Sequence, residues 1–157
     1  MATIQPVVLL AEDNDNDVFM LREALRRAGL EIALQVVEDG EEAIAYLRGT
    51  GKFANRAEYP LPDLFLLDLR MPRRDGFEVL RWLRRQPSLG PLRTIVLTTS
   101  EDISDVDRAY ALGANSFLTK PTDLFDFGNT LEATFNYWLK TTRAPQVNRP
   151  GEVHPPR

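Results

Sequence analysis

Five short apolar segments recur along the chain, and longer segments of mixed polarity separate them. Each apolar segment is four or five residues long and rich in valine, isoleucine, leucine or phenylalanine. Such runs are typical of strands that are buried on both faces of a parallel sheet. The predicted strands cover residues 7–11, 34–37, 64–67, 93–97 and 116–119.

The segments between and after these strands place apolar residues three and four positions apart, which indicates amphipathic helices. The five predicted helices cover residues 17–28, 41–48, 77–85, 102–112 and 122–140. Strands that alternate with helices make right-handed crossovers, so we expect an α/β fold with a doubly wound parallel sheet.

The two last helices carry more specific predictions. In the segment 102–112, one face is expected to bury Ile103, Val106, Ala109 and Tyr110. Thr122 is expected to cap the last helix. The inward stripe of that helix is predicted to consist of Leu124, Phe127, Leu131, Phe135 and Trp138.

The length of 157 residues suits one domain with a tail. Residues 1–142 are predicted to form the domain. Residues 143–157 hold four prolines and no apolar pattern, which predicts a disordered proline-rich tail. No apolar run approaches the roughly 18 residues that cross a bilayer, and no basic segment precedes the first strand. We therefore expect a cytoplasmic protein without membrane contact.

Composition excludes several classes of chemistry. The chain has no cysteine, which excludes disulfides, thiol catalysis and thiolate zinc sites. Its single histidine, His154, lies in the tail, so the domain cannot hold a Ser-His-Asp triad or a histidine-rich metal site. The net charge of −4 argues against direct binding of nucleic acid.

Acidic side chains follow two of the predicted strands. Glu12 and Asp13 come directly after the first strand, and Asp68 follows the third. Ligands of open parallel sheets bind beyond the carboxyl ends of the strands, so these groups are expected to converge there. Three crowded carboxylates need a cation, and oxygen ligands favour Mg²⁺. Taken alone, Asp68 could instead cap the turn that follows it.

Two further polar residues follow the fourth and the fifth predicted strands. Thr98 comes after the fourth strand and Lys120 after the fifth. Phosphoryl transfer needs positioning and charge neutralisation, which a metal ion, a lysine and a hydroxyl supply. The central carboxylate, Asp68, is the best candidate for an aspartyl-phosphate acceptor. Each residue alone has an ordinary interpretation, Lys120 as a solvated charge and Thr98 as a turn hydroxyl.

These residues stand in four motifs that together resemble the response regulator receiver domain of two-component signalling. The motifs are Leu-Ala-Glu-Asp-Asn at 10–14, Leu-Leu-Asp-Leu-Arg-Met-Pro at 66–72 with Asp-Gly at 75–76, Val-Leu-Thr-Thr-Ser at 96–100, and Phe-Leu-Thr-Lys-Pro at 117–121. The resemblance covers about residues 6–140. The loop 49–62 and the ending Trp138-Leu139 are similar to the stand-alone regulators that pair with bacterial phytochromes.

The resemblance implies a flavodoxin-like (βα)5 fold and a single-domain response regulator. Such a protein is a phosphoacceptor switch that assists its own phosphorylation and dephosphorylation, rather than an enzyme with a turned-over substrate. Asp68 would accept the phosphoryl group from a sensor histidine kinase, a phytochrome in the most similar pairs. Mg²⁺ would bind Glu12, Asp13, Asp68 and the backbone carbonyl of Arg70.

The resemblance also assigns the switch. Lys120 would pair with the phosphate, Thr98 would move to bond it, and Phe117 would swing inward behind Thr98. The Lys120–Pro121 bond would be cis. Two positions depart from the commonest pattern: Arg70 could reach the phosphate and change its lifetime, and the bulk of Thr99 could narrow access to the acceptor.

The output surface is predicted from residues that the core does not require. The last helix holds more aromatic residues than one inward stripe uses, which often marks an interface. Receiver domains commonly pair through helix 4, strand 5 and helix 5, so we expect a homodimer on that face. We expect no output domain after Lys140. Six arginines near the third helix form either a solvated face or a docking patch for an acidic partner. They are Arg70, Arg73, Arg74, Arg81, Arg84 and Arg85.

Two functions from other classes remain open at this stage. One is a phosphatase or hydrolase with an aspartyl nucleophile, which would normally have a second acid shortly after Asp68. Here Leu69 and Arg70 stand on that side. The other is a degenerate receiver that only binds partners, against which the full set of acids, Thr98 and Lys120 argues.

Overall fold

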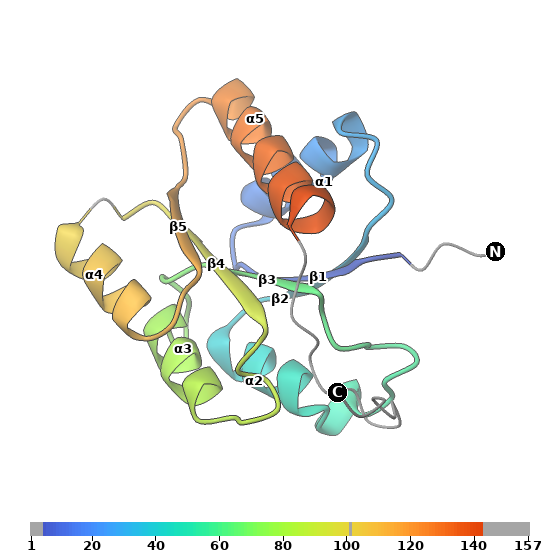
Figure 1. Ribbon diagram of the computed structural model, residues 1–157, viewed down its shortest axis with the longest axis vertical. Helices are drawn as coiled ribbons and strands as arrows, with labels where there is room; N and C mark the ends of the chain where they lie inside the picture. The colour runs from blue at the N-terminus through green and yellow to red at the C-terminus, as the bar shows by residue number, and fades with distance from the viewer. Residues whose placement is uncertain (1–4, 101, 143–157) are drawn as a thin grey trace.

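Five parallel strands form one sheet in the order β2-β1-β3-β4-β5 (Figure 1). The computed structural model describes residues 5–100 and 102–142. The strands are β1 Val7–Ala11, β2 Ala33–Val37, β3 Leu64–Leu67, β4 Arg93–Thr98 and β5 Ser116–Thr119. The predicted doubly wound sheet is confirmed, and the observed strand bounds differ from the predicted ones only by one residue in β2 and in β4.

Five α-helices alternate with these strands. They are α1 Asp15–Arg27, α2 Gly40–Arg48, α3 Gly76–Arg84, α4 Ile103–Ala111 and α5 Leu124–Phe135. A 3₁₀ turn at Gly51–Phe53 follows α2, and a π-helical turn at Asn136–Thr141 follows α5. Each α-helix begins after a side chain that accepts a backbone N–H of the first turn, which replaces a missing helical bond. These caps are Asn14, Asp39, Asp75, Asp102 and Asp123.

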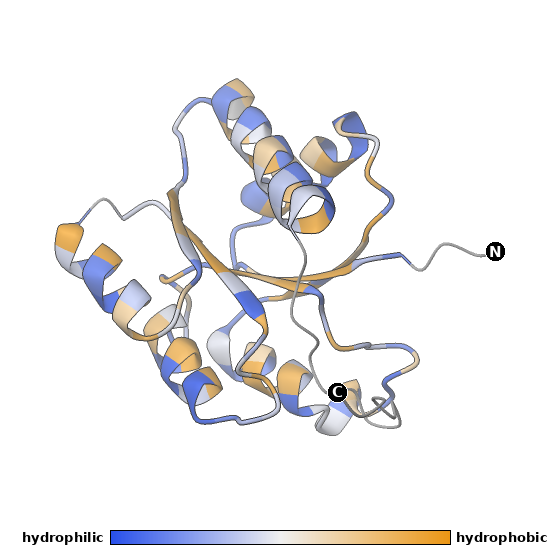
Figure 2. Cartoon of the chain, in the orientation of Figure 1, coloured by the Kyte–Doolittle hydropathy of each residue, from blue (hydrophilic) through white to orange (hydrophobic). Residues whose placement is uncertain are grey.

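The sheet lies between two layers of helices. Figure 1 shows α1 and α5 on one face and α2, α3 and α4 on the other. Successive side chains of a strand point to opposite faces. In β3, Leu64 and Leu66 pack toward α1 and α5, whereas Phe65 and Leu67 pack toward α2 and α3. Every residue of this strand is buried, and the strands carry the most hydrophobic ribbon in Figure 2. The central strand is therefore anchored on both faces.

The last helix departs from its prediction at both ends. Asp123, not Thr122, is the cap, because its carboxylate accepts the backbone N–H groups of Phe125 and Asp126. The α-helix ends at Phe135, and the chain continues to Thr141 as a π-helical turn rather than as α-helix. The inward stripe is confirmed for Phe127, Leu131 and Phe135, Trp138 is half-buried, and the side chain of Leu124 lies outside the described residues.

The predicted inward face of α4 is wrong at two positions. Ile103 is 75% exposed and Tyr110 is 47% exposed, while Ala109 is fully buried. The helix lies beside the edge strand β5 (Figure 1), so its first turn has no sheet beneath it to cover Ile103. The predicted disorder of residues 143–157 falls outside the described residues. Within the described part of the chain, no helix is long and apolar enough to span a membrane.

We expect Gly40→Ala to lower the free energy of unfolding by about 1–3 kcal/mol, the usual cost of an overfilled site. A Cβ at residue 40 would overlap the carbonyl group of Arg74, to which the Gly40 N–H donates at 3.1 Å. Gly90→Ala is the matched control, since a Cβ there meets no atom closer than 3.8 Å. Urea denaturation of both variants measures the difference, and equal midpoints would contradict the packing described for the start of α2.

Candidate functional site

The carboxyl ends of four strands meet at one edge of the sheet and present polar side chains there. Hydrogen bonding continues one residue past three of the strands. Glu12 donates its N–H to the carbonyl of Val37, Asp68 to Ala11, and Lys120 to Thr98. The side chains of Glu12, Asp68, Thr98 and Lys120 are all buried. This placement confirms only that these predicted site residues share one edge; their roles remain predictions.

Three carboxylates at this edge lie close enough to share one cation. Glu12, Asp13 and Asp68 each offer an oxygen, and these oxygens all lie within 4.8 Å of one another. Glu12 and Asp68 are buried, whereas Asp13 is exposed and leaves the cluster open to solvent. Backbone N–H groups orient the buried pair, from Asn14 to Glu12 at 3.1 Å and from Arg70 to Asp68 at 3.3 Å. An open set of carboxylate oxygens fits Mg²⁺, which retains water and binds phosphate oxygens.

Lys120 is the buried cation that contacts this cluster. Its ammonium donates to Glu12 at 2.5 Å, to Asp17 at 2.7 Å and to Asp68 at 3.4 Å. Burial tends to lower the pKa of Lys120, but the hydrogen bonds to Asp17 and Glu12 and the charge of Asp68 outweigh it, so the pKa rises above its ordinary value. Lys120 is therefore a fixed positive charge that the carboxylates share.

The pKa of Glu12 is shifted by its surroundings in the cluster. Burial and the neighbouring charge of Asp68 raise the pKa of Glu12 to about 7, although the hydrogen bond from Lys120 opposes them. The Glu12 carboxylate has lost its water and is also repelled by the negative charge of Asp68. A cation between Glu12 and Asp68 would relieve the repulsion, because it replaces lost solvation with direct coordination.

Asp17, in the first turn of α1, belongs to the site although the sequence did not indicate it. Its carboxylate accepts from Lys120 across a separation of 103 residues in the sequence. The available signal was the excess of acids and amides in the segment 12–17, of which capping uses only Asn14. The contact depends on how the fold brings the first turn of α1 to the residue that follows β5, which periodicity does not specify.

A second group of contacts, also missed, ties the loop after Asp68 to α4. The Arg70 guanidinium pairs with Asp105 at 3.0 Å, and the Ser100 hydroxyl donates to the same carboxylate at 2.6 Å. The Ser100 N–H in turn lies 3.5 Å from the hydroxyl of Thr98. The Arg70 side chain is thus held by α4. The predicted role of Arg70 as a metal ligand involves only its backbone carbonyl, so the two contacts do not compete. Thr99 is exposed.

The predicted switch residues have clear positions. Thr98 is fully buried, and Phe117 is half-buried against the core on the α3 and α4 side of the sheet. The backbone N–H of Phe117 donates to the Tyr110 hydroxyl at 3.1 Å. The predicted cis bond is wrong: the Lys120–Pro121 peptide is trans, the isomer that X–Pro bonds favour by roughly 0.5–1 kcal/mol.

Known proteins share this fold and this edge. The family model of the response regulator receiver domain matches residues 8–132. Response regulator Rcp1 of Synechocystis sp. is 36% identical over 139 residues, which cover 88% of this chain and 92% of Rcp1.

Two solved structures are similar over almost the whole described chain. The phosphorylated cyanobacterial phytochrome response regulator RcpA has a TM-score of 0.86 at 35% identity, covering 91% of this chain and 100% of RcpA. The Mn²⁺-bound form of Rcp1 has a TM-score of 0.84 at 35% identity, covering 90% of this chain and 99% of Rcp1. The residues that the family model matches, 8–132, include the ends of all four strands that form the site.

Proposed function

This chain belongs to the response regulator receiver domain family, and from that premise we propose that Asp68 is its phosphoacceptor. Receiver domains take a phosphoryl group from histidine kinases. The observation that supports Asp68 is its place at the end of the central strand β3. There it lies between the acids that follow β1 and Thr98 of β4, and it accepts from Lys120. Glu12, by contrast, makes the shortest contact to Lys120.

The proposed reaction is an in-line displacement at phosphorus. A carboxylate oxygen of Asp68 attacks the phosphoryl group of a phosphohistidine, the P–O bond forms, and the P–N bond breaks with the electron pair leaving on imidazole. Glu12, Asp13, Asp68 and the Arg70 carbonyl would hold Mg²⁺, which neutralises charge on the phosphoryl oxygens. Lys120 would exchange part of its contact with the carboxylates for the phosphate, and Thr98 would donate its hydroxyl. The same groups would assist hydrolysis of the acyl phosphate.

The partner we propose is a sensor histidine kinase of the phytochrome type. The support is the likeness to Rcp1 and to the phytochrome response regulator RcpA over nearly the full chain. The test mixes the protein with a phosphorylated phytochrome histidine kinase and follows loss of kinase phosphohistidine. Transfer to wild type and to Asp75→Asn, but not to Asp68→Asn, would support the proposal. Asp75→Asn is the matched control because aspartate and asparagine at position 75 can both cap α3. Transfer to Asp68→Asn would refute it.

The pKa of Glu12 predicts how Mg²⁺ binding depends on pH. Because the pKa is raised to about 7 in the folded protein, Glu12 stabilises the metal-free fold below its ordinary pKa of 4.5 and loses that contribution as pH rises through 7. Mg²⁺ needs the ionised carboxylate, so its stabilising effect must grow over the same range. We expect a larger Mg²⁺-induced rise in Tm at pH 8 than at pH 6. Glu12→Gln should remove most of that pH dependence, and an equal rise at both values in wild type would contradict it.

We also propose that phosphorylation alters a dimer surface formed by α4, β5 and α5. The support is the set of exposed apolar and aromatic residues on α4, α5 and the π-helical turn, which no described part of the chain covers. They are Ile103, Tyr110, Phe125 and Tyr137. The bonds from Arg70 and Ser100 to Asp105, and from Phe117 to Tyr110, give the site a route to this face.

A homodimer is the expected result of light scattering with and without beryllofluoride, a phosphoryl mimic. Phe125→Ser should raise the dimer dissociation constant by about tenfold, since a buried aromatic side chain contributes about 1.5–3 kcal/mol. Phe19→Ser on α1 is the control, because Phe19 is similarly exposed on another helix. A monomer in both states would contradict the proposed surface.

A further inference from the structure

Arginines outnumber acids along the groove between α2 and α3, which Arg48, Arg56 and Arg74 line together with Glu41. Arg70 and Arg73 pair with Asp105 and Asp39. Among the described residues, five further arginines of this side make no ion pair. They are Arg48, Arg74, Arg81, Arg84 and Arg85. The whole chain has a net charge of −4, whereas the charged residues that line this groove are three arginines and one glutamate. Such a field attracts an acidic partner.

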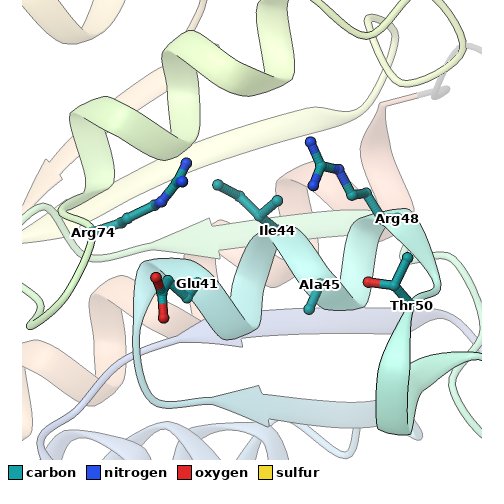
Figure 3. A pocket seen from close by; sticks show the side chains of 6 residues that line it. All are labelled: Glu41, Ile44, Ala45, Arg48, Thr50 and Arg74. Atoms are coloured by element: carbon teal, nitrogen blue, oxygen red, sulfur yellow. The ribbon is translucent and has the colours of Figure 1, made fainter.

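Two hollows lie along this surface and share Arg48. The first has a volume of about 210 Å³ and is lined by Glu41, Ile44, Ala45 and Arg48 of α2 together with Thr50 and Arg74. In Figure 3 the guanidinium groups of Arg74 and Arg48 stand toward its two ends, with the side chain of Ile44 between them. The second hollow, of about 280 Å³, adds an apolar wall made of Leu47, Leu61, Trp82 and Leu89. The surface therefore alternates cationic and apolar contacts.

Trp82 supplies an observation of a different kind. Its indole N–H is buried and has no hydrogen-bond acceptor among the described residues. The guanidinium of Arg48 lies over the ring, 5.3 Å from its centroid. Nearly all buried donors in folded proteins have a partner, so this one is an exception. A carboxylate that pairs with Arg48 would arrive next to this ring.

We propose that the groove between α2 and α3, from Arg74 past Arg48 to Trp82, binds a carboxylate-rich amphipathic segment of a partner protein. Its acids would pair with Arg48 and Arg74, and its apolar side chains would lie against the half-buried Trp82 and the edge of the apolar wall beside it. Nucleic acid fits less well, because it has no side chains for the apolar wall and is repelled by the net charge of the chain. The chain's own residues 143–157 hold three arginines and one glutamate, which is the wrong charge.

The groove is also connected to the loop that follows Asp68. Arg74 belongs to that loop, and its carbonyl accepts the Gly40 N–H of α2. Arg73 beside it pairs with the buried Asp39 at 3.4 Å. The groove can therefore respond to changes at the phosphoacceptor, but its existence does not depend on the assignment of Asp68. The unphosphorylated chain is enough to test it.

The test is an NMR titration of the ¹⁵N-labelled full chain with a synthetic sixteen-residue helical peptide of glutamate and leucine. We expect shifts of backbone amides in 41–50 and 74–89 and of the Trp82 indole N–H, which Trp82→Phe identifies. Arg48→Gln with Arg74→Gln should weaken binding at least about fivefold, the sum of two exposed ion pairs. Arg22→Gln with Arg27→Gln on α1 changes the charge equally and should leave the affinity within twofold.

Three outcomes would overturn the proposal. Equal weakening by both double variants would show that only net charge matters. Shifts confined to other surfaces would place the peptide elsewhere. A sixteen-nucleotide thymidine oligomer that binds as tightly, with the same shifts, would mark the surface as a general polyanion site rather than a site for a protein segment. A lysine-for-glutamate version of the peptide should not bind.

Discussion

A Lys120→Met variant is expected to lose about 3–5 kcal/mol of unfolding free energy in the absence of Mg²⁺, the usual cost of removing one partner from a buried ion pair. The Lys120 side chain is 6% exposed, and its ammonium donates to Glu12, Asp17 and Asp68. Without it, Glu12 and Asp68 remain buried with no positive neighbour in contact. The loss is large because a domain of this size is stable by only about 5–15 kcal/mol.

Urea denaturation with and without Mg²⁺ measures this effect. Lys52→Met is the matched control, since its ammonium is 65% exposed and pairs with Glu42 at 2.7 Å. An exposed pair contributes at most about 1 kcal/mol. Mg²⁺ should restore part of the stability of Lys120→Met, because the ion supplies the missing positive charge. If the two variants lost the same stability, or if Mg²⁺ had no effect on Lys120→Met, the carboxylate cluster would not hold the charge inferred for it.

Removal of Mg²⁺ is expected to slow phosphoryl incorporation by about a hundredfold or more. A metal ion contributes several kcal/mol of charge stabilisation in the transition state, and each 1.36 kcal/mol is tenfold in rate. Asp13→Asn should raise the dissociation constant for Mg²⁺ by at least about tenfold, as the loss of a weaker outer-shell contact can already do. Asp13 is the exposed member of the cluster, so this substitution removes a ligand with little effect on packing.

Asp15→Asn is the control for this prediction. Asp15 is also exposed and lies in the first turn of α1, but it is not among the three clustered carboxylates. Titration calorimetry with Mg²⁺ and a rate measurement with acetyl phosphate in EDTA test the two parts separately. Incorporation at an unchanged rate in EDTA would remove the metal from the mechanism. Equal affinities of Asp13→Asn and Asp15→Asn would remove only Asp13.

The sequence predicted the sheet well because burial on both faces leaves a simple pattern. Leu64 to Leu67 are apolar without a break, and all four are buried. Placing the strands in one parallel sheet also brings their carboxyl ends together, so the convergence of Glu12, Asp68 and Lys120 followed from connectivity alone. The chemistry of these residue types suggested a Mg²⁺ site and a phosphoacceptor, whereas only the family resemblance assigned the switch roles of Thr98 and Phe117.

The failures have a common physical origin in contacts that the periodicity of a single element does not encode. Ile103 has the spacing of a core residue, yet the sheet ends before it can cover that side chain. Thr122 and Asp123 are both good caps, and only the path of the chain selects Asp123. Asp17 contacts Lys120, and Asp105 contacts Arg70, across long separations in the sequence. Neither acid could therefore be distinguished from the many other acids of the chain.

Asp68 as the phosphoacceptor is tested by intact mass spectrometry after incubation with Mg²⁺ and acetyl phosphate. We expect one added phosphoryl group on wild type and on Asp75→Asn, located by peptide mapping to the segment that contains Asp68. We expect none on Asp68→Asn, whose amide is neutral and a poor nucleophile. An adduct on Asp68→Asn equal to that on wild type, or no adduct on wild type even with a phosphorylated kinase, would contradict it. The latter result would favour a receiver that acts only as a binding module.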